Sequence, residues 1–118
     1  MNSEEFVEAV KEVVRDSVIE DTIENLEDPP GRKVSEAEKL RSEWFNNLSD
    51  NGRSNVESIV AEAVDEAIFG LLTVLDGARA IEDGDDKGRL LLVHKGLTEV
   101  LLNDPDKIGL HDLYNAKD

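Results

Sequence analysis

The sequence predicts an α+β fold that is mainly helical, with three longer helices, one β-hairpin in the C-terminal half and a short C-terminal helix. Up to about residue 82, apolar residues recur at the three- and four-residue spacing of amphipathic helices. After residue 88 the pattern changes to two brief apolar runs, and turn-forming residues separate the segments. The sequence has no internal repeat, low-complexity stretch or break in composition. We therefore expect residues 1–118 to form a single acidic domain.

The first predicted helix begins at Ser3, which we take as the N-cap because a serine oxygen accepts from free amides of the first turn. It runs for about 24 residues and ends at residues 27–31, Glu-Asp-Pro-Pro-Gly, since proline disfavours the α conformation in the residue before it. Valine is only a middling helix former, so burial must hold this helix, and a strand over Val13–Ile19 is the alternative. Its apolar positions are Phe6, Val7, Val10, Val13, Val14, Ser17, Val18, Ile23 and Leu26.

The second helix is predicted to begin at Ser35, because Ser35 and Glu38 have the spacing of a capping box. Its apolar side contains Leu40, Trp44, Phe45 and Leu48. The turn-forming residues 49–52, Ser-Asp-Asn-Gly, are expected to end it.

A second capping box, Ser54 with Glu57, predicts the start of the third helix. This helix has the strongest periodic signal in the chain, and we expect it to continue to about Glu82, although Gly77 is an alternative end. From Ala67 onward it is apolar nearly all round, which predicts the central buried element.

Two short apolar runs, Arg89–His94 and Leu97–Leu102, predict a β-hairpin that turns at Lys95-Gly96, with the glycine at positive φ. An isolated hairpin is only marginally stable, so it has to pack on the helices. Asp104 as N-cap and Pro105 at the first helical position predict the last short helix.

The charge composition excludes several classes of partner. The chain has 28 acidic and 13 basic residues and a formal net charge of −15, which disfavours binding to nucleic acid or to an anionic membrane surface. It has no cysteine, and therefore no disulfide, thiolate metal site or thiol catalysis. The N-terminus lacks the pattern of a signal peptide, and no apolar stretch approaches the roughly 20 residues that span a bilayer. We expect a cytoplasmic protein with a basic or neutral partner.

The acidic residues are concentrated in two stretches. Residues 1–28 contain ten acidic and two basic residues, a net charge of −8, and residues 53–88 have a net charge of −6. The first interpretation of this acidity is a solvated face that maintains solubility. Like charges spaced four apart destabilise an isolated helix, however, and this favours as the alternative a surface that binds a basic partner. The partner-binding residues predicted on the first helix are Glu4, Glu8, Glu12, Asp16, Glu20 and Glu24.

Trp44 and Phe45 are adjacent and cannot both face one core. We expect different neighbours to bury each of them; the alternative is that one is exposed as an interface anchor, or is covered by residues 29–31. We therefore include Trp44 among the partner-binding candidates. Basic residues surround this segment and could pair with the first helix of the same chain or of a second copy; they are Arg32, Lys33, Lys39, Arg41 and Arg53.

One group of side chains is a candidate metal-binding site. Glu62, Asp65 and Glu66 share a face of the third helix, and carboxylates of this kind can hold Mg²⁺. Glu5-x-x-Glu8 with Glu62-x-x-Asp65 resembles the acidic motifs of all-helical nucleoside-triphosphate pyrophosphatases, although the rest of that pattern and its lysine cluster are missing. The resemblance implies a Mg²⁺-dependent nucleotide hydrolase as an alternative function. The two histidines form no zinc set, no serine lies in a nucleophile elbow, and we predict no cofactor.

Residues 56–70 and 75–77, with Leu102-Asn103-Asp104-Pro105 and residues 111–114 (His-Asp-Leu-Tyr), resemble small uncharacterised bacterial proteins encoded beside toxins. This resemblance implies an immunity protein that binds a cognate toxin. Together with the charge, it favours a non-enzymatic protein that neutralises a basic toxin domain. A structural or regulatory homodimer is a further alternative.

Overall fold

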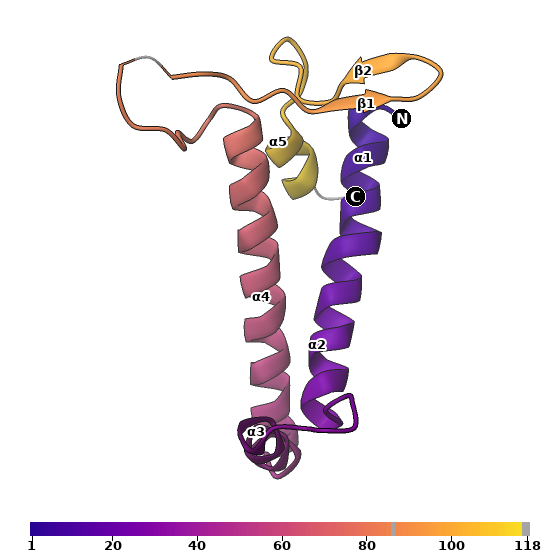
Figure 1. Cartoon of the computed structure of the whole chain (residues 1–118), viewed down its shortest axis with the longest axis vertical. Helices are drawn as coiled ribbons and strands as arrows, with labels where there is room; N and C mark the ends of the chain where they lie inside the picture. The colour runs from indigo at the N-terminus through magenta and orange to yellow at the C-terminus, as the bar shows by residue number, and fades with distance from the viewer. Residues whose placement is uncertain (86, 117–118) are drawn as a thin grey trace. The chain divides into compact units, whose positions relative to one another are not determined.

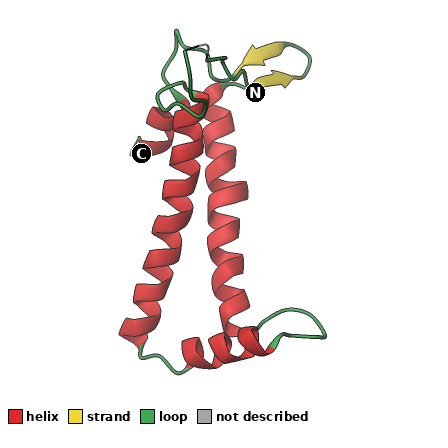
Figure 2. Cartoon of the chain, turned by 60° about the vertical axis from the view of Figure 1, so that its left-hand side comes forward, coloured by secondary structure: helices red, strands yellow, loops and turns green. Residues whose placement is uncertain are grey.

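The structure, a computed structural model, describes residues 1–85 and 87–116 (Figure 1). It confirms a mainly helical fold with a two-stranded hairpin in the C-terminal half and a short C-terminal helix (Figure 2). The chain divides into two compact units. The first unit comprises residues 1–14 and 66–118, and the second comprises residues 15–65.

The first helical stretch runs through α1 (Ser3–Ala9), the π-helix η1 (Val10–Asp16) and α2 (Ser17–Glu27). Its bounds agree with the sequence prediction, but the π-helix was not predicted, and Ser3 is not the N-cap. Asn2 is the N-cap, and it forms a reciprocal capping box with Glu5. The hydroxyl of Ser3 instead donates to the carbonyl of Leu102 (2.7 Å), which ties the start of α1 to the end of the hairpin.

In the second unit, α3 (Glu36–Asn46) begins after Ser35 as predicted, and the Ser35 side chain accepts from the amide of Glu38. The helix packs against α2 and completes its C-terminus. Both the Ser42 hydroxyl (3.1 Å) and the Asn46 amide (3.0 Å) donate to the carbonyl of Glu27, one of the last-turn carbonyls that lack a partner within the helix. The core of this unit is small, with Phe45 fully buried beneath the guanidinium of Arg53.

Helix α4 (Asp50–Leu75) corrects both predicted ends of the third helix. It begins four residues before Ser54, because the Ser49 hydroxyl accepts from the amide of Gly52, and the predicted turn at residues 49–52 is therefore its first turn. It ends at Leu75 rather than near Glu82. Gly77 has a φ of +76° and its amide bonds back to Val74, while the next amide bonds to Thr73; this is a Schellman motif.

Helix α4 is also less buried than its composition predicts. Only Leu72 and Thr73 are buried, whereas Ile59 and Leu71 are more than half exposed. Leu72 belongs to the core of the first unit, together with Val7 of α1 and with Leu110 and Tyr114 of the last helix. The expectation of a central buried helix was therefore wrong for most of its length.

The hairpin pairs β1 (Val93–Lys95) with β2 (Glu99–Leu101) in antiparallel register, so its loop is residues 96–98. Gly96 does not have positive φ, contrary to expectation. A Cβ at this position would lie 3.0 Å from the His94 ring, so the glycine leaves room for that ring.

The last helix, α5 (Leu110–Asn115), begins later than predicted. Asp104 caps a turn and not the helix. Its side chain accepts a hydrogen bond from the amide of Asp106, and its backbone carbonyl accepts one from the amide of Lys107. The helix itself starts after Gly109 and is docked through Leu110 and Tyr114.

Candidate functional site

The acidic side chains predicted on the first helical stretch all lie at the surface. Glu4, Glu8 and Glu12 are exposed in the first unit, and Asp16, Glu20 and Glu24 are exposed in the second. Asp16 also forms an ion pair with its neighbour Arg15 (2.9 Å). Solvent exposure is what a partner-binding surface requires, and it is equally what solubility requires.

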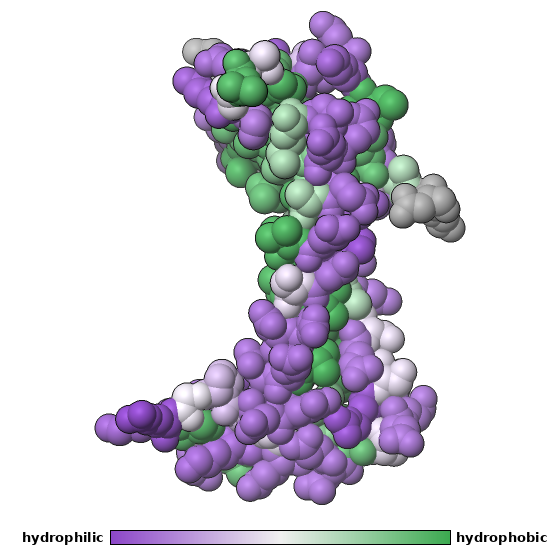
Figure 3. All heavy atoms as spheres, turned by 90° about the vertical axis from the view of Figure 1, so that its right-hand side faces the viewer, coloured by the Kyte–Doolittle hydropathy of each residue, from purple (hydrophilic) through white to green (hydrophobic). Residues whose placement is uncertain are grey.

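In the second unit, α2 has one acidic side and one apolar side. Glu20, Asp21 and Glu24, which we call the acidic α2 face, are exposed, and α2 contains no basic residue. The opposite side carries half-buried residues, namely Ile19, Thr22, Ile23 and Leu26. In the lower part of Figure 3, hydrophilic residues (purple) cover most of the surface, with a few hydrophobic ones (green) between them.

Trp44 and Phe45 have different environments, and the expectation that both are packed was wrong. Phe45 is 0% exposed, whereas Trp44 is 54% exposed and its neighbour one turn earlier, Leu40, is 57% exposed. Leu40 and Trp44 are spaced i, i+4, so they lie side by side on α3; we call them the Leu40–Trp44 ridge. Pro29 and Pro30 line a cavity of about 270 Å³ with Arg41 and Ser42.

The basic residues around α3 were expected to pair with the acidic first helix. One of them does so within the second unit: Arg53 bonds to Glu27 (2.9 Å). Across the part of the chain that the structure describes, Arg32, Lys33, Lys39 and Arg41 form no ion pair.

The structure does not add support for the metal alternative. Glu62 of the second unit and Glu66 of the first are exposed, and Asp65 is half-buried and makes an interaction of its own. Within residues 1–85 and 87–116, no three histidine, aspartate or glutamate side chains are grouped so that they could hold a metal ion.

A polar pair that the sequence did not indicate lies in the first unit. Asp76, the residue after α4, accepts a hydrogen bond from the backbone amide of His111 (2.8 Å), and the same oxygen contacts His111 Nδ1. A carboxylate only accepts hydrogen bonds, so the ring donates to Asp76 through Nδ1. The Nε2 atom lies 3.5 Å from Asp112, and the ring meets the edge of Phe69. These contacts hold the start of α5 at the end of α4, which is a structural role.

Gly109 permits this pair. A Cβ at position 109 would lie 2.9 Å from the Asp76 carboxylate and 3.2 Å from the His111 ring. The sequence places Asp76 and His111 35 residues apart, so no local motif signals their contact.

No helix in the part of the chain that the structure describes is long and apolar enough to cross a membrane. The chain matches no protein-family model, and neither the curated proteins nor the solved structures include a significant match to it.

Proposed function

We propose that the chain is a non-enzymatic protein-binding protein of the cytoplasm, an acidic immunity protein or inhibitor that neutralises a basic toxin domain. The observation that supports this most is the exposed Trp44 beside the fully buried Phe45. Tryptophan is one of the three residue types enriched among interface residues that dominate binding energy. A half-exposed tryptophan on a helix does not contribute to the core of the second unit.

Two features of the second unit would act at different steps of binding, one in association and one in holding the complex together. The acidic α2 face accelerates encounter with a cationic protein and makes the encounter sensitive to salt. The Leu40–Trp44 ridge supplies apolar surface, whose burial stabilises the complex once it has formed. Glu4, Glu8 and Glu12 of the first unit add to the negative field that a basic partner meets.

The test uses the product of the gene that neighbours this one. Its toxicity is measured in cells with and without this chain, and its affinity for the purified chain is measured at about 50 mM and 500 mM salt. We expect rescue of growth, and weaker binding at the higher salt. Affinity that does not change with salt would contradict the electrostatic part of the proposal.

Matched variants separate the two parts of the surface. Glu20→Gln with Glu24→Gln should slow association at low salt by about tenfold, and the difference should shrink at high salt. Asp83→Asn with Asp85→Asn removes the same charge from an exposed loop and should have little effect. Trp44→Ala should speed dissociation, whereas Ile59→Ala, another exposed apolar residue of the second unit, should not.

The hydrolase alternative has an independent test. Titration with Mg²⁺, followed by a panel of nucleoside triphosphates, should give neither binding nor turnover if the proposal is correct. Turnover that is lost in Glu62→Gln with Glu66→Gln would replace the proposal with that alternative.

A further inference from the structure

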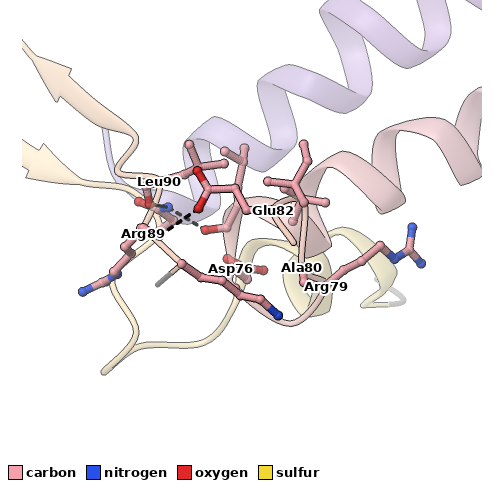
Figure 4. Close-up of a pocket in the computed structure, with 13 residues that line it drawn as sticks. Asp76, Arg79, Ala80, Glu82, Arg89 and Leu90 are labelled. Atoms are coloured by element: carbon pink, nitrogen blue, oxygen red, sulfur yellow. Dashed lines mark hydrogen bonds between the residues drawn. The ribbon is translucent and has the colours of Figure 1, made fainter. Parts of the chain in front are cut away.

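A pocket of about 450 Å³ lies in the first unit, where the chain leaves α4 and folds back towards the hairpin (Figure 4). Its walls are largely apolar and come from Val74, Leu75, Ala80, Ile81 and Leu90. Ile81 is 70% exposed and Leu90 is 47% exposed, so large apolar side chains border an open space. A volume of this size is in the range of small-molecule sites.

Hydrogen bonds fix the frame of this pocket. The buried Asn103 side chain donates to the carbonyls of Leu75 (2.6 Å) and Leu90 (2.8 Å), which joins the end of α4 to the returning chain. Glu82 accepts from the amide of Gly88 (2.8 Å), which closes the loop between them. In Figure 4 the Glu82 carboxylate points towards this amide. The apolar walls are therefore held apart by bonds that do not depend on a ligand.

The charges around the pocket differ from those of the chain as a whole. Arg79, Lys87 and Arg89 line it, and none of the three has an ion-pair or hydrogen-bond partner among residues 1–85 and 87–116. The two acidic residues that line it are already engaged, Glu82 by Gly88 and Asp76 by His111. The side chains of Arg79 and Arg89 extend to opposite sides of the pocket (Figure 4). In a chain with a net charge of −15, three basic residues that line one apolar pocket and have no partner among the described residues favour an anionic ligand.

We propose that this pocket binds a small amphipathic carboxylate, with its apolar part against Ile81 and Leu90 and its carboxylate at the basic residues of the rim. Arginine and lysine side chains are long enough to turn towards a carboxylate at the mouth, and arginine can bind it through two parallel hydrogen bonds. A cationic ligand would be repelled by the basic rim, and a neutral one would gain nothing from its charge. The site is separate from the surface proposed in the second unit and does not depend on it.

The test is a titration of the ¹⁵N-labelled full chain with octanoate, octanol and octylamine, each below its aggregation limit. Octanoate should shift the amides of Ala80, Gly88 and Leu90 in a saturable way, with a dissociation constant of about 1 mM or lower. Octanol should bind about tenfold more weakly, since it has the same chain without the charge. Equal binding of octanol, or no saturable shift up to about 5 mM octanoate, would overturn the proposal.

Variants at exposed positions test the apolar and the charged contacts of the pocket separately, and are not expected to unfold the chain. Ile81→Asn and Arg89→Gln should each weaken octanoate binding by about threefold or more. The matched controls are Ile108→Asn, which makes the same change, and Lys107→Gln, which removes the same charge. Both lie at exposed positions outside the pocket and should leave binding unchanged. Weakening by the controls equal to that by the pocket variants would refute the assignment of the site.

The carboxylate could belong to a free acid or to the end of a peptide chain, so a second ligand distinguishes them. N-acetyl-Leu-Leu is titrated with a free and with an amidated C-terminus. Tighter binding of the free dipeptide than of octanoate identifies a peptide end as the source, and the reverse identifies a free acid. Equal shifts with the free and amidated forms would count against recognition of a carboxylate.

Discussion

The two units of the chain bury different amounts of apolar surface. Among the described residues, the first unit contains five of the six buried hydrophobic side chains, and the second unit contains only Phe45. Both units also expose large apolar side chains, so the difference between them lies in the buried core. Regions with few buried apolar contacts open at lower free energy, and binding surfaces are drawn from them. The weaker core and the proposed partner surface thus fall in the same unit.

The largest expected effect is that of Phe45→Ala in the second unit. Removing the ring leaves a cavity beneath Arg53 and should lower the free energy of unfolding of this unit by about 3–5 kcal/mol. Hydrogen exchange should show loss of protection for the amides of α3, while those of Leu72 and Leu110 in the first unit keep theirs. Uniform loss in both units would mean that the chain unfolds as one cooperative unit, and the comparison would fail.

The neighbouring residue provides the control. Trp44→Ala removes a larger aromatic side chain that is half exposed, so the free energy of unfolding should change by less than about 0.5 kcal/mol. A loss as large as that for Phe45 would indicate that Trp44 is covered in solution.

The second prediction concerns a polar contact of the first unit. Asn103→Ala removes a buried side chain that bonds to the carbonyls of Leu75 and Leu90 and to the amide of Leu92. Backbone groups left unsatisfied should cost about 3 kcal/mol, measured by chemical denaturation. Asn115→Ala, at an exposed position of α5, should be nearly neutral. If the two variants are alike, water satisfies these backbone groups and the Asn103 bonds add little.

The third prediction tests the close approach of Asp76 to Gly109. In Gly109→Ala, the new Cβ would lie 2.9 Å from the carboxylate, which has to move away from His111. Alanine can adopt the backbone conformation of position 109 (φ −64°). Crowding alone should therefore lower the free energy of unfolding, by about 1–2 kcal/mol. Gly88→Ala is the control, because its Cβ would meet Glu82 at an ordinary 3.8 Å. An unchanged His111 Nδ1 resonance in Gly109→Ala would contradict the predicted displacement.

The sequence predicted those features of the fold that depend on neighbouring residues. The end of α2 at Glu27 follows from the two prolines after it, and the start of α3 follows from the Ser35 capping box. It did not predict the bonds of Asn103 or of Asp76, because their partners lie 28 and 35 residues away. The sequence also could not show that Phe45 is buried and Trp44 exposed, because this depends on which neighbouring elements cover each side of the helix. Tertiary packing decides each of these features.

The smallest expected effect distinguishes two serines that look alike in sequence. The structure has Ser49 accepting from the amide of Gly52 at the start of α4 (3.1 Å), while Ser54 lies inside the helix. Ser49→Ala should therefore lower the free energy of unfolding by about 1 kcal/mol, the usual value of an N-cap. Ser54→Ala should instead raise the free energy of unfolding slightly, because alanine is the better residue in a helix interior. Both values come from urea denaturation followed by circular dichroism. The opposite order would move the start of α4 to the second capping box and return residues 49–52 to a turn.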